Sequence, residues 1–321
     1  MGRYILHRIL SMIPVLFGMT LFIFVVLHLA PGDPALEMLG SAAPPEAVEK
    51  LRNELGLNDP LALQFVRYIG NVLRGDFGMS YSSRAPVLEA LLSRYPVTLT
   101  LASVSTLIMV VIGLPIGILS ATRQYSLLDR IPTSVALMGV SMPTFWIGML
   151  LILVFALHLR WLPASGFSTP IHWILPAFAI GFNAAAICMR MTRSTVLEVI
   201  RQDFIRTARA KGQSERRVLV HHALKNALIP ILTVVGIQLG RNLGGSIVTE
   251  TVFSIPGLGY YMLQSILARD YPVVQGGVIF IAATFSLVNL CVDLLYAFVD
   301  PRIRSQYQAM AKKKAPRGVA A

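Results

Sequence analysis

The chain has 321 residues, and its composition excludes an ordinary soluble protein. Hydrophobic residues make up 55% of the sequence, charged residues only 14%, and the mean hydropathy is +0.65. An average soluble chain is about one quarter charged, so soluble domains of this composition would lack the polar surface they need. The composition therefore predicts a polytopic membrane protein.

Six segments are apolar and long enough to cross a bilayer, which takes about 20 residues of helix. These segments are 9–30, 97–121, 131–159, 171–189, 227–249 and 273–299. The first four contain no Asp, Glu, Lys or Arg, whereas the fifth contains Arg241 and the sixth contains Asp293. Four prolines interrupt the predicted spans, which neighbouring helices can compensate, namely Pro14, Pro115, Pro143 and Pro176. We interpret the first span as an uncleaved anchor, because no small-residue cleavage site follows it.

The distribution of Lys and Arg predicts the orientation in the membrane. With the amino terminus in the cytoplasm, the inner segments carry 19 Lys and Arg and the outer segments carry 8. Six of those eight lie in the long segment 31–96, where the rule is weak. Both termini are therefore expected in the cytoplasm. The net charge of +12 then reflects topology, and we expect no nucleic-acid partner. Cys188 and Cys291 both lie in apolar segments, so neither a disulfide framework nor a metal site is expected.

The outer segment 31–96 contains two helical patterns. In 45–55, apolar residues recur at Val48, Leu51 and Leu55, and in 61–73 they recur at Phe65, Ile69 and Leu73. These apolar faces need cover, which predicts a small cap packed on the mouth of the protein. The expected organisation is an anchor (1–30), the cap segment (31–96), a five-helix core (97–305) and a basic, disordered, lipid-facing cytoplasmic tail (306–321).

The longest inner segment predicts a helix–turn–helix. Val196, Ile200, Phe204 and Ala208 repeat every four residues and would line one helix face. Basic residues and Glu198 would occupy the opposite face. Gly212 follows as a helix stop, and Ser214 is placed to begin a second helix. Periodicity alone leaves two interpretations, an amphipathic connector lying on lipid headgroups or a docking element for a cytoplasmic partner.

A family resemblance favours docking. Residues 204–212 read Phe-Ile-Arg-Thr-Ala-Arg-Ala-Lys-Gly, and residues 222–230 read His-Ala-Leu-Lys-Asn-Ala-Leu-Ile-Pro. Together they resemble the coupling loop of ABC importer permeases of the dipeptide/oligopeptide/nickel branch. The broad family motif is Glu-Ala-Ala, three residues, then Gly, of which only Ala208 and Gly212 match here. The form Arg-Thr-Ala-Arg-Ala-Lys-Gly is typical of the peptide branch.

Further short strings resemble the same branch, in the same order along the chain. They are the residues at 31–34, 55–60, 75–78, 161–163, 244–253, 256–259, 269–272 and 300–304. Each is weak by itself, but together they extend the resemblance along nearly the whole chain.

The resemblance implies an all-α polytopic membrane protein with six transmembrane helices. It would be a type I ABC importer permease-like subunit, of the first-permease or "B" type, in the bacterial inner membrane, with an extracytoplasmic cap segment between helices 1 and 2. Its coupling loop would span 192–226, with the ATPase-coupling residues Arg206, Thr207, Ala208, Arg209, Ala210, Lys211 and Gly212.

The same resemblance implies the partners and the substrate. The partners would be a homologous second permease subunit, two cytoplasmic ATPase subunits, an extracytoplasmic substrate-binding protein and membrane lipid. No cofactor is expected in this chain, because ATP and Mg would bind to the ATPase subunits. The expected substrate is a di- or oligopeptide, with glutathione and a nickel chelate as alternatives.

Charged and small residues in the last two spans are candidates for the translocation path or for a seam between subunits. They are Arg241, Gly244, Gly245 and Asp293. Ionisable residues inside a membrane are functional candidates by default, and glycines let helices approach closely. For Asp293, a structural pair or a helix-packing hydrogen bond is the favoured interpretation. Arg241 departs from the family, which has an apolar residue at this place.

Two other classes of protein are less consistent with the sequence. An enzyme would need a catalytic motif, and neither a phosphate-binding loop nor a His-Glu-x-x-His zinc motif occurs. Adjacent His221 and His222 point to different helix faces and cannot share a metal unaided. A self-sufficient secondary transporter or channel would favour internal inverted repeats and paired intramembrane ionisable groups, and neither is visible.

Overall fold

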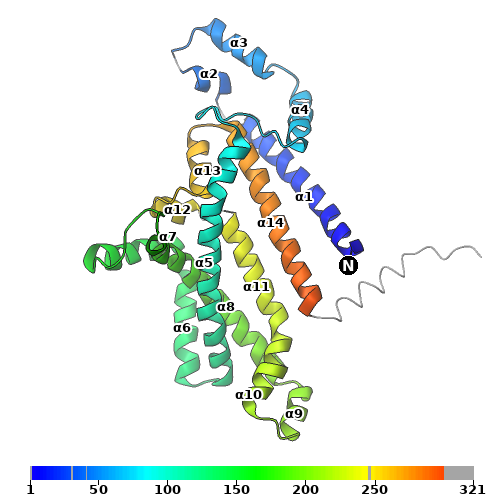
Figure 1. Ribbon diagram of the computed structural model, residues 1–321, viewed down its shortest axis with the longest axis vertical. Helices are drawn as coiled ribbons and strands as arrows, with labels where there is room; N and C mark the ends of the chain where they lie inside the picture. Colours follow the sequence, from blue (N-terminus) through cyan, green and yellow to red (C-terminus); the bar gives the residue numbers. More distant parts are fainter. Residues whose placement is uncertain (1, 30–31, 41, 245–246, 300–321) are drawn as a thin grey trace, which may run out of the picture.

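A computed structural model describes residues 2–29, 32–40, 42–244 and 247–299, with the side chains of residues 5–295 (Figure 1). The predicted tail 306–321 lies outside these residues. Regular structure in the described part of the chain is helical, which confirms the predicted fold class. Five long helices form the main bundle: α1 (Gly2–Leu29), α5 (Val87–Thr122), α8 (Ile174–Ile200), α11 (Lys225–Leu243) and α14 (Tyr271–Val299).

The centre of the bundle is the pair α5 and α8, and small residues bring the two helices together. A Cβ atom added to Gly113 would lie 2.7 Å from the carbonyl oxygen of Ala185, and one added to Gly117 would lie 2.7 Å from that of Met189. From the other side, a Cβ on Gly181 would lie 2.8 Å from Ile108. Glycine is required at these positions because the backbone of each glycine lies directly against the backbone or a side chain of the other helix.

The third predicted span is bent rather than straight. Helix α6 (Leu127–Ser141) meets α7 (Thr144–Leu151), which continues as the π-helical segment η1 (Ile152–His158), at an angle of 105°. Pro143 explains the break, because a proline forces the residue before it out of the helical region, and Met142 is extended at φ −83° and ψ 129°. The described residues contain five helices long and apolar enough to cross a membrane, and six spans if the bent pair α6–α7–η1 is counted as one.

The cap segment lies at one end of the bundle, which we call the cap end (Figure 1). It contains α2 (Pro34–Leu39), α3 (Pro45–Leu55) and α4 (Leu61–Leu73), and the last two confirm the predicted helices. Phe65 packs against Phe24 of α1, with ring centroids 5.2 Å apart. The predicted burial is only partly correct. Val48 is buried, but Leu73, the last residue of α4, is 82% exposed because it lies beyond Phe65 and Tyr68, which contact α1.

Helix α5 begins ten residues before the predicted span, at Val87. Val87 and Leu91 are fully buried and pack with Leu258 at the start of α13 (Leu258–Leu267) and with Val273 of α14. Residues 87–96 therefore continue the bundle toward the cap. The short helix α12 (Ile247–Val252) lies between α11 and α13, and the 3-10 turn η2 (Pro170–Trp173) leads into α8.

The opposite end of the bundle, which we call the coupling end, carries α9 (Asp203–Ala210), α10 (Glu215–Arg217) and the π-helical segment η3 (Val218–Leu224). The predicted single helix from Val196 to Ala208 is wrong. Helix α8 ends at Ile200, and the two residues before α9 rotate its apolar face. As a result Ile205 is fully buried, whereas Phe204 is 40% exposed.

Candidate functional site

The coupling end is organised around a tight turn at Gly212. The N–H of Gly212 donates to the carbonyl of Arg209 at 2.9 Å, and the N–H of Gln213 donates to the carbonyl of Ala208 at 3.3 Å. This is the Schellman pattern, which requires a left-handed residue after the helix, and Gly212 has φ +74°. The turn predicted at Gly212 is therefore present. Ser214 precedes α10 as predicted, but its side chain makes no capping hydrogen bond.

Two side-chain contacts brace this turn. The guanidinium of Arg209 donates to both oxygens of Glu215, from Nε at 2.7 Å and from Nη2 at 3.1 Å. Behind the turn, the ring Nε2 of His222 lies 2.8 Å from Oε1 of Gln213. These contacts hold the end of the eight-residue helix α9, and the turn that follows it, to α10 and η3.

The inner face of α9 packs on the bundle. Ile205 and Ala208 join a buried cluster that also contains Ala121, Val196, Val199, Val218, Ala223, Ala227 and Ile231. This cluster therefore joins α9 to α5, α8 and α11. Interiors are packed as densely as organic crystals, so such a contact has little slack.

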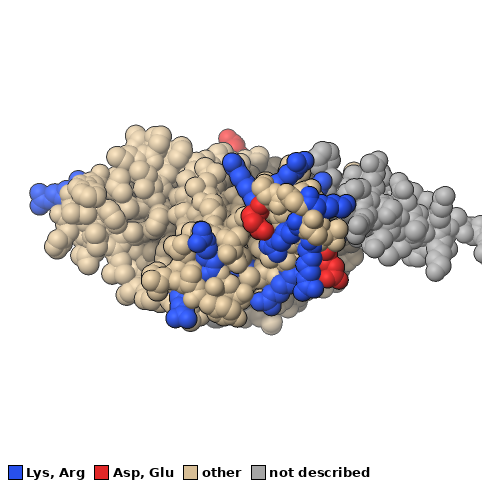
Figure 2. Space-filling view, turned by 90° about the horizontal axis from the view of Figure 1, so that it is seen from below, with Lys and Arg blue, Asp and Glu red and all other residues tan. Residues whose placement is uncertain are grey.

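The remaining predicted coupling residues lie on the outer surface. Ala210, Lys211 and Gly212 are exposed, and nothing lies within 4 Å of a Cβ built on Gly212. Arg206 is exposed and lies 3.6 Å from Asp203, while the Thr207 hydroxyl donates to the Asp203 carbonyl at 3.0 Å. Lys and Arg gather over this end of the molecule (Figure 2). The predicted coupling residues thus fall into three groups. Ala208 packs on the bundle, Arg209 braces the turn, and the others form an open basic face.

A buried ion pair at the coupling end escaped the sequence reasoning. The carboxylate of Asp129 accepts from Nε and Nη2 of Arg193 at 2.6 and 2.8 Å, and also from the Ser120 hydroxyl and the Tyr125 N–H. Asp129 is 3% exposed. It joins the end of α5, the start of α6 and the last third of α8. The spacing Ser126-x-x-Asp129 is typical of a helix start and could have predicted the start of α6. It carries no information about Arg193, the partner of Asp129.

A second buried carboxylate, Glu250, joins α5 to the segment that follows α11. Oε1 of Glu250 accepts from the Thr98 hydroxyl at 2.9 Å, and Oε2 accepts from the N–H of Tyr260 at 2.7 Å. The Thr98 oxygen in turn accepts from the N–H of Leu258 at 2.8 Å. A Cβ on Gly257 would lie 2.6 Å from this carboxylate, so the loop before α13 can close over Glu250 only with glycine there.

Asp270 makes the equivalent connection at the cap end. Its carboxylate accepts from the Ser80 hydroxyl at 2.5 Å and from the N–H groups of Tyr81 and Ser82 at 3.1 Å each. Asp270 is 1% exposed. The loop that enters α5 is therefore held to the turn between α13 and α14.

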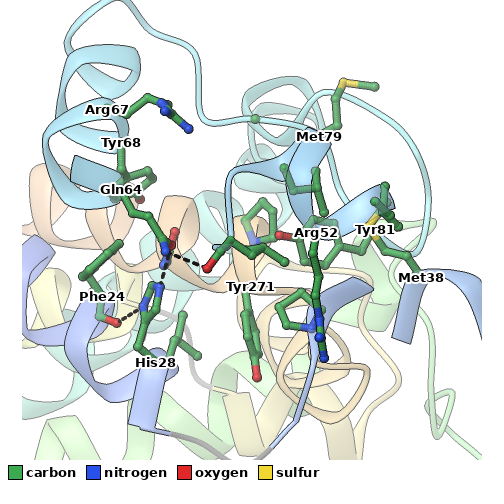
Figure 3. Close-up of a pocket in the computed structure, with 18 of the residues that line it drawn as sticks. Phe24, His28, Met38, Arg52, Gln64, Arg67, Tyr68, Met79, Tyr81 and Tyr271 are labelled. Carbon is green, nitrogen blue, oxygen red and sulfur yellow. Dashed lines mark hydrogen bonds between the residues drawn. The ribbon is translucent and has the colours of Figure 1, made fainter. Parts of the chain in front are cut away.

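A cavity of about 980 Å³ opens beneath the cap (Figure 3). Its walls come from the end of α1, from α3 and α4, from the loop 76–84 and from the start of α14. Arg52 in this wall donates to Asp33 at 2.6 and 3.0 Å. Burial, reinforced by the Asp270 charge, raises the pKa of Tyr81 to about 12, so its hydroxyl stays protonated. The wall thus combines aromatic surface with cationic and anionic groups.

The candidate path residues do not form one cluster. Asp293 of α14 pairs with Arg8 of α1, Oδ1 to Nη2 at 3.0 Å, which agrees with the structural interpretation. Gly244 faces Ile281 of α14 in the same chain. Gly245 lies outside the described residues. Arg241 is exposed on α11, with Nη1 3.4 Å from Oε1 of Gln238.

Comparison with known proteins identifies the family. Residues 113–305 match the family described as "Binding-protein-dependent transport system inner membrane component", and residues 1–102 match its N-terminal component. The chain is 44% identical to the dipeptide transport system permease protein DppB of Alkalihalophilus pseudofirmus, covering 95% of this chain and 100% of the relative. It is 43% identical to the glutathione transport system permease protein GsiC of Escherichia coli K12, covering 95% and 99%.

The chain belongs to the binding-protein-dependent permease family. It is a permease subunit of an ABC importer and a multi-pass inner-membrane protein. A solved structure of the inward-facing MetNI methionine ABC transporter shares the fold, with a TM-score of 0.58 at 21% identity over 66% of this chain and 97% of that one. The two relatives of this chain are transport permeases rather than enzymes.

Proposed function

We propose that this permease forms half of the translocation path of an importer of di- and oligopeptides. A homologous second permease would supply the other half, because one bundle of six spans is small for a peptide conduit. The observation that carries this proposal is the coupling end, where a braced helix with an open basic face rests on three bundle helices. A permease driven from outside its own chain needs such an element.

The coupling loop is proposed to seat in the ATPase subunits. Nucleotide-driven motion of two such subunits must reach helices in the membrane, and a flexible loop would absorb it. Gly212, Ala210 and Lys211 form the exposed tip, while Ile205 and Ala208 bear on the bundle. Arg206 and Lys211 would steer docking toward carboxylates more than they would tighten it.

The coupling end is accordingly proposed to face the cytoplasm, with both termini on that side. The excess of Lys and Arg in the inner segments supports this orientation. The start of α1 and the end of α14 meet through Arg8 and Asp293, which supports an arrangement with both ends on the same side. The cap end, with its cavity, would then receive peptide from a soluble binding protein.

The substrate is proposed to be a short peptide because two relatives are named for a dipeptide and for glutathione, itself a tripeptide. A nickel chelate is the remaining alternative of this branch. The binding protein would make most of the selection, so this chain would accept peptides of varied side chains.

Reconstitution tests the proposal. In proteoliposomes that enclose ATP on the side of the coupling end, the complete complex is expected to take up labelled dipeptide. The permease alone is expected to take up none. ATP-dependent uptake by the single chain would contradict the proposal. Exchange of the binding protein is expected to change the substrate while this chain stays the same. Uptake of a nickel chelate but of no peptide by the natural complex would contradict the substrate assignment alone.

A further inference from the structure

Arg241 lies deep within a membrane-spanning helix, where no water is evident for its charged side chain. On α11, Val235 packs against the cluster of Met109, Ala184 and Cys188, and Glu250, beyond the end of α11, bonds to Thr98 of α5. Arg241 follows Val235 by six residues, about 9 Å of helix. It therefore lies between the levels of Met109 and Thr98, inside the uncharged stretch 97–121 of α5.

Helix α14 gives the same depth independently. Gly236, Gly240 and Gly244 form a stripe along α11 that faces α14. A Cβ on Gly240 would lie 2.9 Å from the ring of Phe285. Phe285 is the middle residue of α14 (Tyr271–Val299), so the residue next to Gly240 lies halfway along a helix that crosses the membrane. Figure 1 shows α11 and α14 side by side.

The glycine stripe also decides which way Arg241 faces. Because Gly240 is pressed against α14, the side chain of Arg241 points elsewhere, onto a face of α11 that it shares with Ile237, which is 45% exposed. Its contact within the described chain is with Gln238, at 3.4 Å, which leaves most of the five donors of the guanidinium for another group. The ion pairs formed among the described side chains do not include Arg241.

A guanidinium at this depth is not stable against lipid tails. Ionisable side chains inside the membrane face protein or a water-filled cavity and mark substrate pathways. We propose that this face of α11 lines the aqueous path, and that Arg241 binds the carboxylate of a passing peptide. The guanidinium fork matches a carboxylate with two parallel hydrogen bonds. The assignment rests on the proposed peptide substrate, and it makes this permease selective for anionic groups at mid-membrane.

Thiol labelling tests the aqueous path directly, in the assembled complex. Arg241→Cys would be introduced into a chain in which Cys188→Ala and Cys291→Ser remove the native thiols. The new thiol is expected to react with a water-soluble, membrane-impermeant thiosulfonate, and transported peptide is expected to slow the reaction. Absence of reaction in every nucleotide state would overturn the path assignment, whatever the substrate.

Uptake kinetics test the carboxylate. Arg241→Gln is expected to lower the kcat/KM for a dipeptide about ten- to a hundredfold, the loss typical of a hydrogen bond to a charged group, and Arg241→Lys is expected to retain more. The same dipeptide with a C-terminal amide, measured against the wild-type complex, is expected to lose little in Arg241→Gln. The matched control is Arg160→Gln, because Arg160 is an exposed arginine in the segment between η1 and η2.

Two outcomes separate this inference from the proposed function. In the first outcome, Arg241→Gln lowers uptake of the peptide and of its amide equally, and the second permease no longer co-purifies. Arg241 would then pair with a carboxylate of that subunit, which would overturn the inference. A wild-type complex that takes up no peptide would overturn the proposed substrate instead, while the thiol labelling would still report whether Arg241 faces water.

Discussion

Arg209 and Glu215 face each other across the Gly212 turn and form a bidentate ion pair, although both side chains are largely exposed. An exposed pair contributes only about 0.2–1 kcal/mol to stability, so its value here is geometric. It links the end of α9 to the start of α10, across the turn. We expect the pair to help orient the exposed tip.

Charge reversal tests this bracing role. Arg209→Glu is expected to reduce uptake severalfold with little change in the unfolding temperature, and the addition of Glu215→Arg is expected to restore uptake. The loss should be larger at low salt, because exposed charges are screened over about 10 Å at 0.1 M. Failure of the double variant to recover uptake would mean that Arg209 contacts the ATPase itself.

Substitutions at the tip test docking. Gly212→Val places a β-branched residue at φ +74° and fills the open space, so loss of ATPase co-purification and of uptake is expected. Gly212→Asn is the matched control, because asparagine tolerates the left-handed region, and it should keep most of the activity. Full assembly and uptake in Gly212→Val would leave the loop a surface connector.

Ala210→Trp adds bulk at the tip without altering the packed face of α9. It is expected to abolish ATPase binding while membrane insertion stays intact. Ala208 is unsuitable for this purpose, because it is only 6% exposed and belongs to the buried cluster. Arg206→Glu is expected to weaken uptake less than Ala210→Trp, with an effect that shrinks as salt rises. Co-purification of the ATPase with each variant measures the difference.

The Asp129–Arg193 pair predicts a loss of stability when one member is removed. Breaking a fully buried pair costs about 3–5 kcal/mol, and a smaller loss is expected here because the Arg193 side chain is 25% exposed. Asp129→Ala is therefore expected to lower the unfolding temperature of the purified permease by several degrees. The double variant Asp129→Ala, Arg193→Met should lose less than the sum of the single variants, since contacting residues are not additive. Additive losses would mean that the two side chains act independently.

Asp33 predicts a pH dependence at the cap end. Burial alone would raise its pKa, but hydrogen bonds from Arg52 and from the Ala35 N–H outweigh burial and hold the pKa below its ordinary value. A carboxyl with a lowered folded-state pKa stabilises the fold above its unfolded pKa of about 3.9, and this contribution is lost as the pH falls through the folded value. Wild-type protein should therefore be more stable than Asp33→Asn at pH 6.

Thermal unfolding of both proteins between pH 6 and pH 3 measures this dependence. The difference in unfolding temperature is expected to shrink as the pH falls below about 4. Asp203→Asn, at an almost fully exposed aspartate, should show no comparable pH-dependent difference. A difference between wild type and Asp33→Asn that stays constant down to pH 3 would contradict the prediction.

Local patterns were sufficient for much of the architecture. Apolar runs located the spans, the periodicity in 45–55 and 61–73 located α3 and α4, and Gly212 marked the turn. Each of these features is decided within a few residues, by hydrophobic spacing or by the freedom of glycine at positive φ. The same reasoning failed at Pro143, where a span bends by 105°, and at residues 201–202, where two residues changed the buried face.

Only the tertiary structure decided which distant groups meet. Asp129 pairs with Arg193 across 64 residues, and Glu250 bonds to Thr98 across 152, contacts that no local periodicity encodes. The sequence by itself determined that Arg241 is a charge inside an apolar span. The tertiary structure placed it at the level of Phe285, because Gly240 lets α11 approach α14 there, and directed it about 100° around α11 from that contact. Close helix packing, rather than the residue itself, makes that cation available to a ligand.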